Sequence, residues 1–121
     1  CCDLRFPYLY RALSHAGAVM LTVPAAFTEQ TGKAHWHTLL QARAIENGAF
    51  VFAAAQGGEH TNGRRTYGHS LVVDPWGTIL GDGGDEIGVT VVNIDMGLVA
   101  RARNRIASLT HDKNIAIQAI T

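Results

Sequence analysis

The sequence predicts a mixed α/β domain in which helices cover a sheet that contains both parallel and antiparallel strand pairs. In the first half, helical and strand patterns alternate, and a helical crossover of this kind joins parallel strands. In the second half, two short apolar runs flank Asp74-Pro75-Trp76-Gly77, which is typical of an antiparallel hairpin. The chain has 121 residues, of which 47% are apolar, enough for one domain (1–121) with its own core.

Two helices and two buried strands are expected in the first half. Apolar residues at helical spacing, with Pro7 in the first turn, indicate the first helix, and Asn47-Gly48 ends the second. The strands are short apolar runs of the kind that is buried on both faces of a sheet. The predicted elements are helix 7–16, strand 18–24, helix 34–47 and strand 49–56.

Shorter elements are expected in the second half, separated by polar and glycine-rich turns. Ile115, Ile117 and Ile120 make the C-terminal tail apolar, so we expect the tail to dock on another surface. The predicted elements are loop 57–65, strand 70–73, turn 74–77, strand 78–80, turn 81–85, strand 88–94 and helix 98–109.

Charge and composition argue against several classes of partner. Ten basic and ten acidic residues cancel, so no electrostatic feature favours nucleic acid or a membrane surface. The longest apolar run is too short to span a bilayer, and no signal-peptide pattern opens the sequence. Cys1 and Cys2 are the only cysteines, and a disulfide between sequence neighbours is strained. We therefore expect reduced thiols and a cytoplasmic location.

The cysteine pair allows two interpretations. A thiol just before a helix has a lowered pKa and becomes a better nucleophile, and Arg5 is close in sequence. Alternatively, Cys1 and Cys2 are two small apolar residues with a structural role. Position in the sequence does not decide between them.

A series of motifs resembles the nitrilase superfamily, the carbon–nitrogen hydrolases, from Cys1 to about Leu109. The family's first motif has a cysteine, an aromatic residue, Asp, an apolar residue and Arg-Phe-Pro, and the other motifs follow here in the family's order without large gaps. The matching segments are Cys1–Pro7 with Leu9-Tyr10-Arg11, Val23–Phe27, Thr31–Trp36, Gln41–Asn47, Ala53–Gln56, Tyr67–Ser70 and Val73–Thr78.

The resemblance implies the fold and the site residues. The fold is an αββα layer sandwich, of which this chain supplies roughly the C-terminal half, and family members dimerise in ways that extend the sandwich. Cys1 takes the place of the catalytic nucleophile, which forms a thioester with an amide or a thioimidate with a nitrile, and the backbone N–H of Cys2 points at the oxyanion. Asp3 and Arg5 are expected to form a structural pair that braces the cysteine turn.

Several features depart from the family pattern. The family's general-base glutamate and its lysine precede the cysteine, and neither has a counterpart in this chain. Tyr8 and His37 stand where the family usually has glutamate, and Cys2 stands where it has an aromatic residue. We therefore expect the isolated 121-residue chain to be an inactive part of a carbon–nitrogen hydrolase. The alternative is a non-catalytic, truncated relative that acts as a self-associating structural module.

The remaining expectations concern ligands and assembly. His35 and His37 do not converge on one face of a helix, and no glycine-rich phosphate loop is present, so we expect neither a metal nor a cofactor. The expected partners are a small amide or nitrile substrate and a second copy of the chain. The second copy is expected because strands that are apolar on both faces need a covering layer on each face, and a half sandwich supplies only one.

Overall fold

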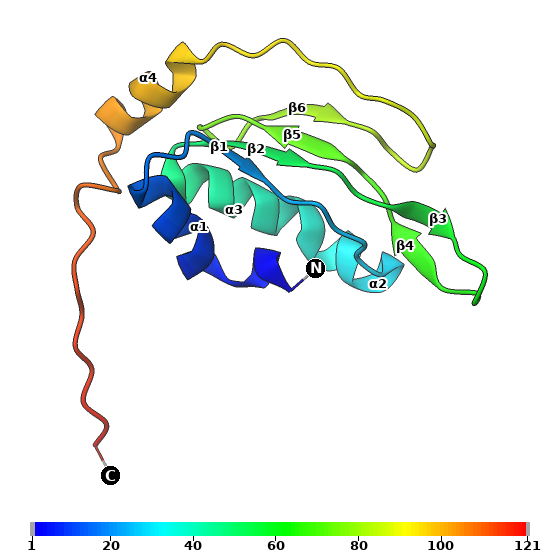
Figure 1. Ribbon diagram of the computed structural model, residues 1–121, viewed down its shortest axis with the longest axis horizontal. Helices are drawn as coiled ribbons and strands as arrows, with labels where there is room; N and C mark the ends of the chain where they lie inside the picture. The colour runs from blue at the N-terminus through cyan, green and yellow to red at the C-terminus, as the bar shows by residue number, and fades with distance from the viewer. Residues whose placement is uncertain (1, 121) are drawn as a thin grey trace.

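The computed structural model describes residues 2–120, which form a four-stranded mixed sheet, a separate two-stranded hairpin and helices (Figure 1). In chain order, the elements are the 3-10 turn η1 (Asp3–Arg5), α1 (Pro7–His15), β1 (Met20–Thr22), α2 (Glu29–Thr31), the π-helical turn η2 (Gly32–Trp36), α3 (His37–Asn47), β2 (Phe50–Ala53), β3 (Gly57–Glu59), β4 (Arg65–Tyr67), β5 (Leu71–Val73), β6 (Ile79–Asp82) and α4 (Gly97–Arg105).

The sheet has the order β1-β2-β5-β6 and confirms the predicted mixed pairing. Strands β1 and β2 are parallel, with α3 in the crossover between them, whereas β2 with β5 and β5 with β6 are antiparallel. Strands β3 and β4 form the separate hairpin. The predicted fold class is therefore confirmed: the chain supplies one sheet and its helical layer.

Helices α1 and α3 pack together on one face of the sheet, and the core lies between them and the strands (Figure 1). Strands β2 and β5 pack against α3, and burying apolar side chains in such an interface stabilises the fold by about 1.5–3 kcal/mol each. The largest completely buried side chains among residues 2–120 are Trp36, Phe50, Leu4, Leu21, Leu40 and Leu71.

Two turns follow directly from the sequence. Gly48 ends α3 in the left-handed conformation, with φ of +56°, which a glycine adopts without the strain a Cβ would cause. In the predicted turn 74–77, the carboxylate of Asp74 accepts hydrogen bonds from the N–H groups of Trp76 (2.8 Å) and Thr78 (3.0 Å). This turn sets the reversal from β5 to β6.

The predicted strand 88–94 is wrong. This segment has no regular structure, and its residues Val89 and Val91 are at least 84% exposed. Apolar alternation alone does not make a strand, because each strand also requires a neighbour that satisfies its backbone hydrogen bonds. No described strand pairs with 88–94. Instead, the segment runs past β6 on the side away from α3, with Val92 and Thr90 against Gly81 (Figure 1).

Other elements differ from expectation in extent. Strand β1 is shorter than predicted and buries only one face, since Met20 and Thr22 are exposed. The expected loop 57–65 contains most of a hairpin, and helix α4 ends at Arg105 rather than near 109. A hairpin of glycine and charged residues has little apolar alternation by which it could be predicted.

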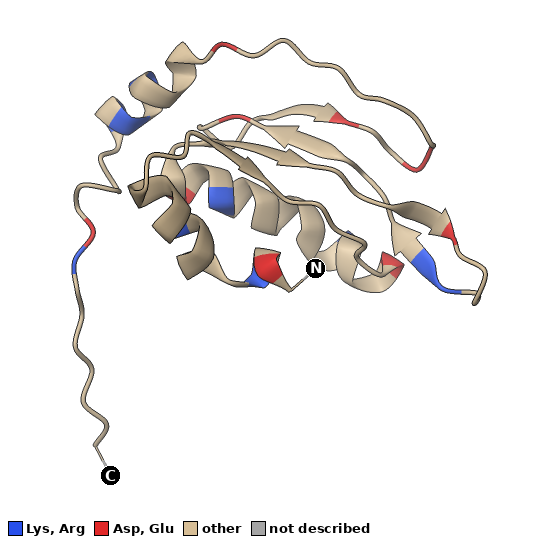
Figure 2. Cartoon of the chain, in the orientation of Figure 1, with Lys and Arg blue, Asp and Glu red and all other residues tan. Residues whose placement is uncertain are grey.

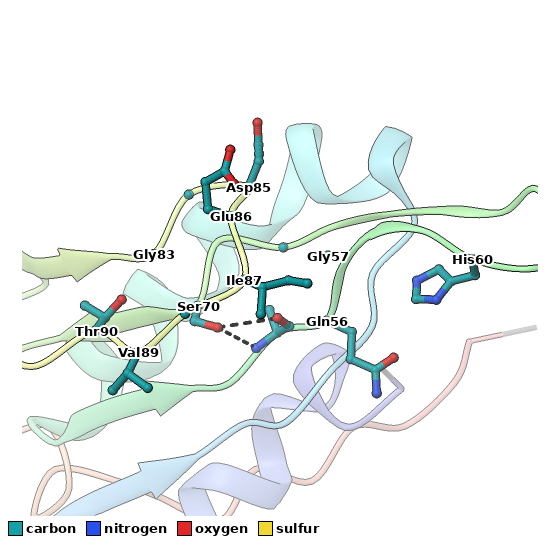
Figure 3. Close-up of a pocket in the computed structure, with 14 residues that line it drawn as sticks. Gln56, Gly57, His60, Ser70, Gly83, Asp85, Glu86, Ile87, Val89 and Thr90 are labelled. Atoms are coloured by element: carbon teal, nitrogen blue, oxygen red, sulfur yellow. Dashed lines mark hydrogen bonds between the residues drawn. The ribbon is translucent and has the colours of Figure 1, made fainter.

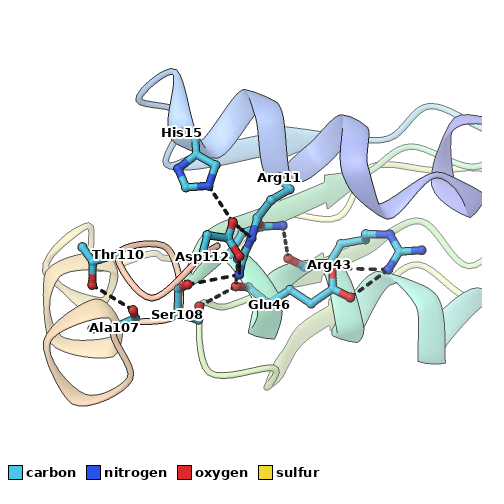
Figure 4. A network of polar contacts seen from close by, with 9 residues as sticks. Arg11, His15, Arg43, Glu46, Ala107, Ser108, Thr110 and Asp112 are labelled. Atoms are coloured by element: carbon cyan, nitrogen blue, oxygen red, sulfur yellow. Dashed lines mark hydrogen bonds and ion pairs between the residues drawn. The ribbon is translucent and has the colours of Figure 1, made fainter. Parts of the chain in front are cut away.

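The turn after α4 is fastened to α1 and α3 by a polar network (Figure 4). Asp112 accepts hydrogen bonds from Arg11 (2.6 Å) and His15 (2.6 Å), and Ser108 donates to the carbonyl oxygen of Glu46 (2.7 Å). These bonds from Arg11 and His15 hold the pKa of the Asp112 carboxyl below its usual value. Beyond this network the tail is exposed through residue 120 and does not dock on the described residues.

Charges of both signs are interspersed along the chain rather than gathered in blocks (Figure 2). Arg103 anchors α4 by donating to the carbonyl oxygens of Ala18 (2.9 Å) and Asn47 (3.2 Å), and its burial lowers its pKa. Among residues 2–120, no helix has the length and apolar character needed to cross a membrane.

Candidate active site

The segment expected to carry the nucleophile is a tight turn ahead of α1. Cys1 itself lies outside the described residues. Cys2 is an exposed free thiol, and its carbonyl oxygen accepts a hydrogen bond from the N–H of Arg5 (2.9 Å). The sequence suggested that the cysteines directly precede the N-terminus of α1. In the structure η1 lies between Cys2 and α1, so Cys2 does not stand directly at this N-terminus.

Contacts of Arg5 place this turn beside the carboxyl end of β1. The guanidinium lies 5.1 Å from the ring centre of Phe27, and Nη2 lies 3.2 Å from Nδ1 of His35. Phe27 follows β1 in sequence, and a parallel bridge between Ala25 and Ala55 continues the pairing of β1 with β2 past their ends. The cysteine turn and the ends of both parallel strands therefore share one edge of the fold.

A cavity of about 590 Å³ opens at this edge (Figure 3). It extends from Gln56 and Ser70 to Asp85 and Thr90, and Ser70 Oγ accepts a hydrogen bond from the N–H of Ala55 (3.0 Å). A second hollow, lined by residues 24–26, 54–56 and Ser70, adjoins it. Ligands of open α/β sheets bind outside the carboxyl ends of the strands, so this edge is the candidate substrate site.

Arg43 is the residue that holds the cysteine turn in place. Its Nε and Nη2 donate to the carbonyl oxygen of Leu4 (3.1 and 2.8 Å), and its Nη1 lies 3.3 Å from the carboxylate of Glu46. Both Arg43 and Leu4 are buried. Sequence reasoning did not single out Arg43, although an arginine on the apolar stripe of a helix, three residues after Leu40, is a signal of a buried polar contact.

The expected pairing of Asp3 with Arg5 is not among the ion pairs of residues 2–120. The backbone carbonyl oxygen of Asp3 accepts a hydrogen bond from the N–H of Phe6 (2.9 Å), and the Asp3 carboxylate acts on the buried Tyr10 through its charge. Burial raises the pKa of Tyr10, the negative charge of Asp3 raises it further, and the positive charge of Arg43 opposes both. Arg5 connects the cysteine turn to the rest of the fold through its contacts with Phe27 and His35.

Two of the departures from the family pattern have definite surroundings. Tyr8 is 70% exposed and stacks on Phe6. His37 hydrogen-bonds to Asp82 through Nε2 (2.9 Å). Burial raises the pKa of Asp82, but hydrogen bonds from His37, the N–H of Gly84 and His69 outweigh burial and leave this pKa below its usual value.

The mixed sheet, its helical layer and the cysteine turn agree with the nitrilase-type fold that the motifs imply. Residues 1–104 match the family model described as carbon–nitrogen hydrolase, and the chain belongs to this family. The resemblance stated from the sequence motifs is thereby confirmed.

Curated relatives of this chain include amidases. The deaminated glutathione amidase of Synechocystis is 51% identical over 111 residues, which cover 92% of this chain and 41% of that protein. The chain thus spans less than half the length of this relative.

Solved structures share the fold. The NitFhit protein of C. elegans superposes with a TM-score of 0.84 at 43% identity, over 93% of this chain and 27% of that one. An amidase mutant from Nesterenkonia superposes with a TM-score of 0.69 at 34% identity, over 91% of this chain and 40% of that one. That structure carries the acetamide moiety of fluoroacetamide on its active site cysteine.

Proposed function

We propose that the protein carrying this chain hydrolyses the amide bond of a small substrate with Cys1 as its nucleophile. The observation that carries this proposal is the contact of Arg5 with Phe27, which brings the cysteine turn to the carboxyl side of β1. The cavity opens beside residues 55–57, which follow the neighbouring strand β2. The identity of 51% with a deaminated glutathione amidase makes deaminated glutathione the substrate that we propose first.

The proposed reaction has two steps. The Cys1 thiolate attacks the amide carbonyl carbon, the C–N bond breaks, and the amine leaves with a proton, which produces a thioester. Water then attacks the thioester, releases the carboxylic acid and returns the thiol. The N–H of Cys2 stabilises the oxyanion in both steps, and the family's glutamate and lysine supply the base and a positive charge.

The test uses the protein as encoded, with any sequence that precedes Cys1, beside the 121-residue chain. We expect the encoded protein to convert deaminated glutathione into a free amine and a carboxylic acid, detected by mass spectrometry. The 121-residue chain is expected to be inactive, since loss of acid–base catalysis alone lowers rates by about 10²–10⁴-fold. Lack of turnover of this and of simple amides by the encoded protein would contradict the proposal.

Because a thiol nucleophile works only when reduced, we also propose a cytoplasmic location.

Exposed apolar side chains favour self-association of the chain. Self-association is also the basis of the alternative function, that of a non-catalytic structural module. Ile87, Val89 and Val91 are almost entirely exposed on one extended segment, and Ile45 is 53% exposed on α3. Monomeric proteins rarely leave an apolar patch larger than about 300–600 Å² uncovered. We therefore propose that the chain forms at least a homodimer through these surfaces.

Sedimentation equilibrium at micromolar concentration tests this prediction. The chain is expected to sediment as a dimer or larger, and the double variant Val89→Lys with Val91→Lys is expected to shift the distribution toward monomer. The matched control is Met20→Lys plus Ile106→Lys, since both side chains are also exposed but lie outside the segment. A folded wild-type monomer that binds no apolar dye would contradict the proposal.

A further inference from the structure

Three side chains from separate segments meet beside the N-terminal end of α3. Asp82, at the end of β6, lies between two imidazoles: its Oδ2 is 2.9 Å from Nε2 of His37, and its Oδ1 is 2.9 Å from Nδ1 of His69. The candidate ligand atoms of the three residues all lie within 4.8 Å of one another. Their side chains are 23–33% exposed, so the group is both sheltered and reachable from solvent.

His69 has a carboxylate at each of its ring nitrogens. Besides the contact of Nδ1 with Asp82, its Nε2 lies 3.1 Å from Oδ1 of Asp85. A neutral imidazole carries only one N–H, so it can donate to only one of the two carboxylates. Both contacts are favourable when the ring is doubly protonated, or when a cation stands between Nδ1 and Asp82 while Nε2–H donates to Asp85. The second arrangement is the usual one for a histidine that binds a metal, whose other N–H is held by a carboxylate.

The position of His69 is fixed by its surroundings at a cost in backbone strain. Its φ of +61° is left-handed, and it is the only residue other than glycine in residues 2–120 with a positive φ. The indole N–H of Trp36 donates to its carbonyl oxygen (2.8 Å), and the ring of Tyr67 stacks on its imidazole at 4.2 Å. Strained residues held in place by their neighbours are concentrated at functional sites.

Tyr67 is in turn seated against the backbone of η2. A Cβ at Gly32 would stand 2.3 Å from Cβ of Tyr67, so only glycine allows this approach. Two basic residues line the hollow next to His69, but Lys33 and Arg65 are both paired with Glu29 (3.1 and 3.0 Å), which offsets their charge.

We propose that His37, His69 and Asp82 bind one divalent transition-metal ion of the zinc type. Two imidazole nitrogens and a carboxylate suit Zn²⁺ and Co²⁺, and three protein ligands leave a fourth position for water. The ion replaces the protons that join Asp82 to the two rings, and Asp85 orients His69 from the far side. The expectation from the sequence that no metal binds considered His35 and His37; the fold instead combines His37 with a histidine 32 positions further along.

The test is a titration of the metal-free encoded protein with Co²⁺. Binding is monitored through the visible d–d absorption of the bound Co²⁺. One equivalent is expected to bind, and Zn²⁺ is expected to displace it. The variants His37→Gln, His69→Asn and Asp82→Asn are each expected to weaken binding by at least about tenfold. Asparagine is chosen for position 69 because it tolerates the left-handed backbone. The matched control, His111→Gln, removes an exposed histidine elsewhere and is expected to bind Co²⁺ like the wild type.

A second readout does not depend on whether the variants fold. The chain has six histidines, and diamagnetic Zn²⁺ is expected to shift most strongly the imidazole NMR signals of two of them, His37 and His69, in the wild-type protein. No saturable Co²⁺ binding, equal affinity in the control and the three variants, or shifts confined to other histidines would each overturn the proposal. The three side chains would then be a hydrogen-bonded cluster without a metal.

Discussion

Replacing Cys1 by alanine is expected to lower kcat/KM for amide hydrolysis on the order of 10⁶-fold, the loss that follows removal of an enzymatic nucleophile. Without the thiolate no thioester forms, so the binding site and the remaining groups are left to assist a direct attack by water. The measurement is the initial rate of substrate turnover by the encoded protein and its Cys1→Ala variant.

The matched control is Cys2→Ala. Cys2 is proposed to act through its backbone N–H, which alanine retains, and its side chain is exposed. We therefore expect Cys2→Ala to keep kcat/KM within about tenfold of the wild type, far above Cys1→Ala. Equal losses in the two variants, or a Cys1→Ala variant with near-normal turnover, would show that Cys1 is not the nucleophile.

Replacing Arg43 by alanine is expected to lower the free energy of unfolding by about 3 kcal/mol. The Arg43 side chain is 5% exposed, and its guanidinium makes two hydrogen bonds to the carbonyl oxygen of Leu4. Its removal leaves this buried oxygen without its donor and opens a cavity between α3 and the cysteine turn. The measurement is urea unfolding, read as a shift of the midpoint.

Arg101→Ala is the control for this prediction. Arg101 also makes a short ion pair, with Asp95 (2.6 Å), but its side chain is 61% exposed. Exposed ion pairs contribute little to stability, so this variant is expected to unfold at nearly the wild-type urea concentration. If Arg43→Ala unfolds at the same midpoint as Arg101→Ala, the guanidinium does not support the turn. Both variants remove one positive charge, so a difference between their unfolding midpoints reports the effect of burial.

Features that depend on local sequence were predicted well. The helix end at Gly48 and the turn 74–77 each depend on one or two residues whose backbone or side-chain preferences hold in any context. The parallel pair β1–β2 followed from the order of strand, helix and strand, since a helical crossover places the two strands side by side. The fold class could therefore be predicted from the sequence.

Features that depend on distant partners were not predicted. Segment 88–94 has the apolar alternation of a strand, but no described strand pairs with it, so the pattern alone could not decide its structure. The support of the cysteine turn by Arg43 joins residues 39 positions apart, and the meeting of His37 with Asp82 spans 45. Such contacts are set by the packing of whole elements rather than by local spacing.

The cysteine turn itself was identified from sequence motifs, and its place at the carboxyl edge of β1 came from the structure. Arg5 was expected to pair with Asp3, a neighbour in sequence, whereas it contacts Phe27 and His35. The motifs thus assign the nucleophile to this segment as a prediction, and the fold determines what surrounds the segment.

Mapping of a covalent adduct tests the central proposal, a nucleophilic Cys1, most directly. The encoded protein is treated with a limiting amount of fluoroacetamide at neutral pH, digested and analysed by mass spectrometry. We expect the acetamide moiety on Cys1, with Cys2 unmodified, and we expect prior addition of substrate to slow the labelling. An adduct on Cys2, or none on either cysteine of the native protein, would contradict the assignment of Cys1 as the nucleophile.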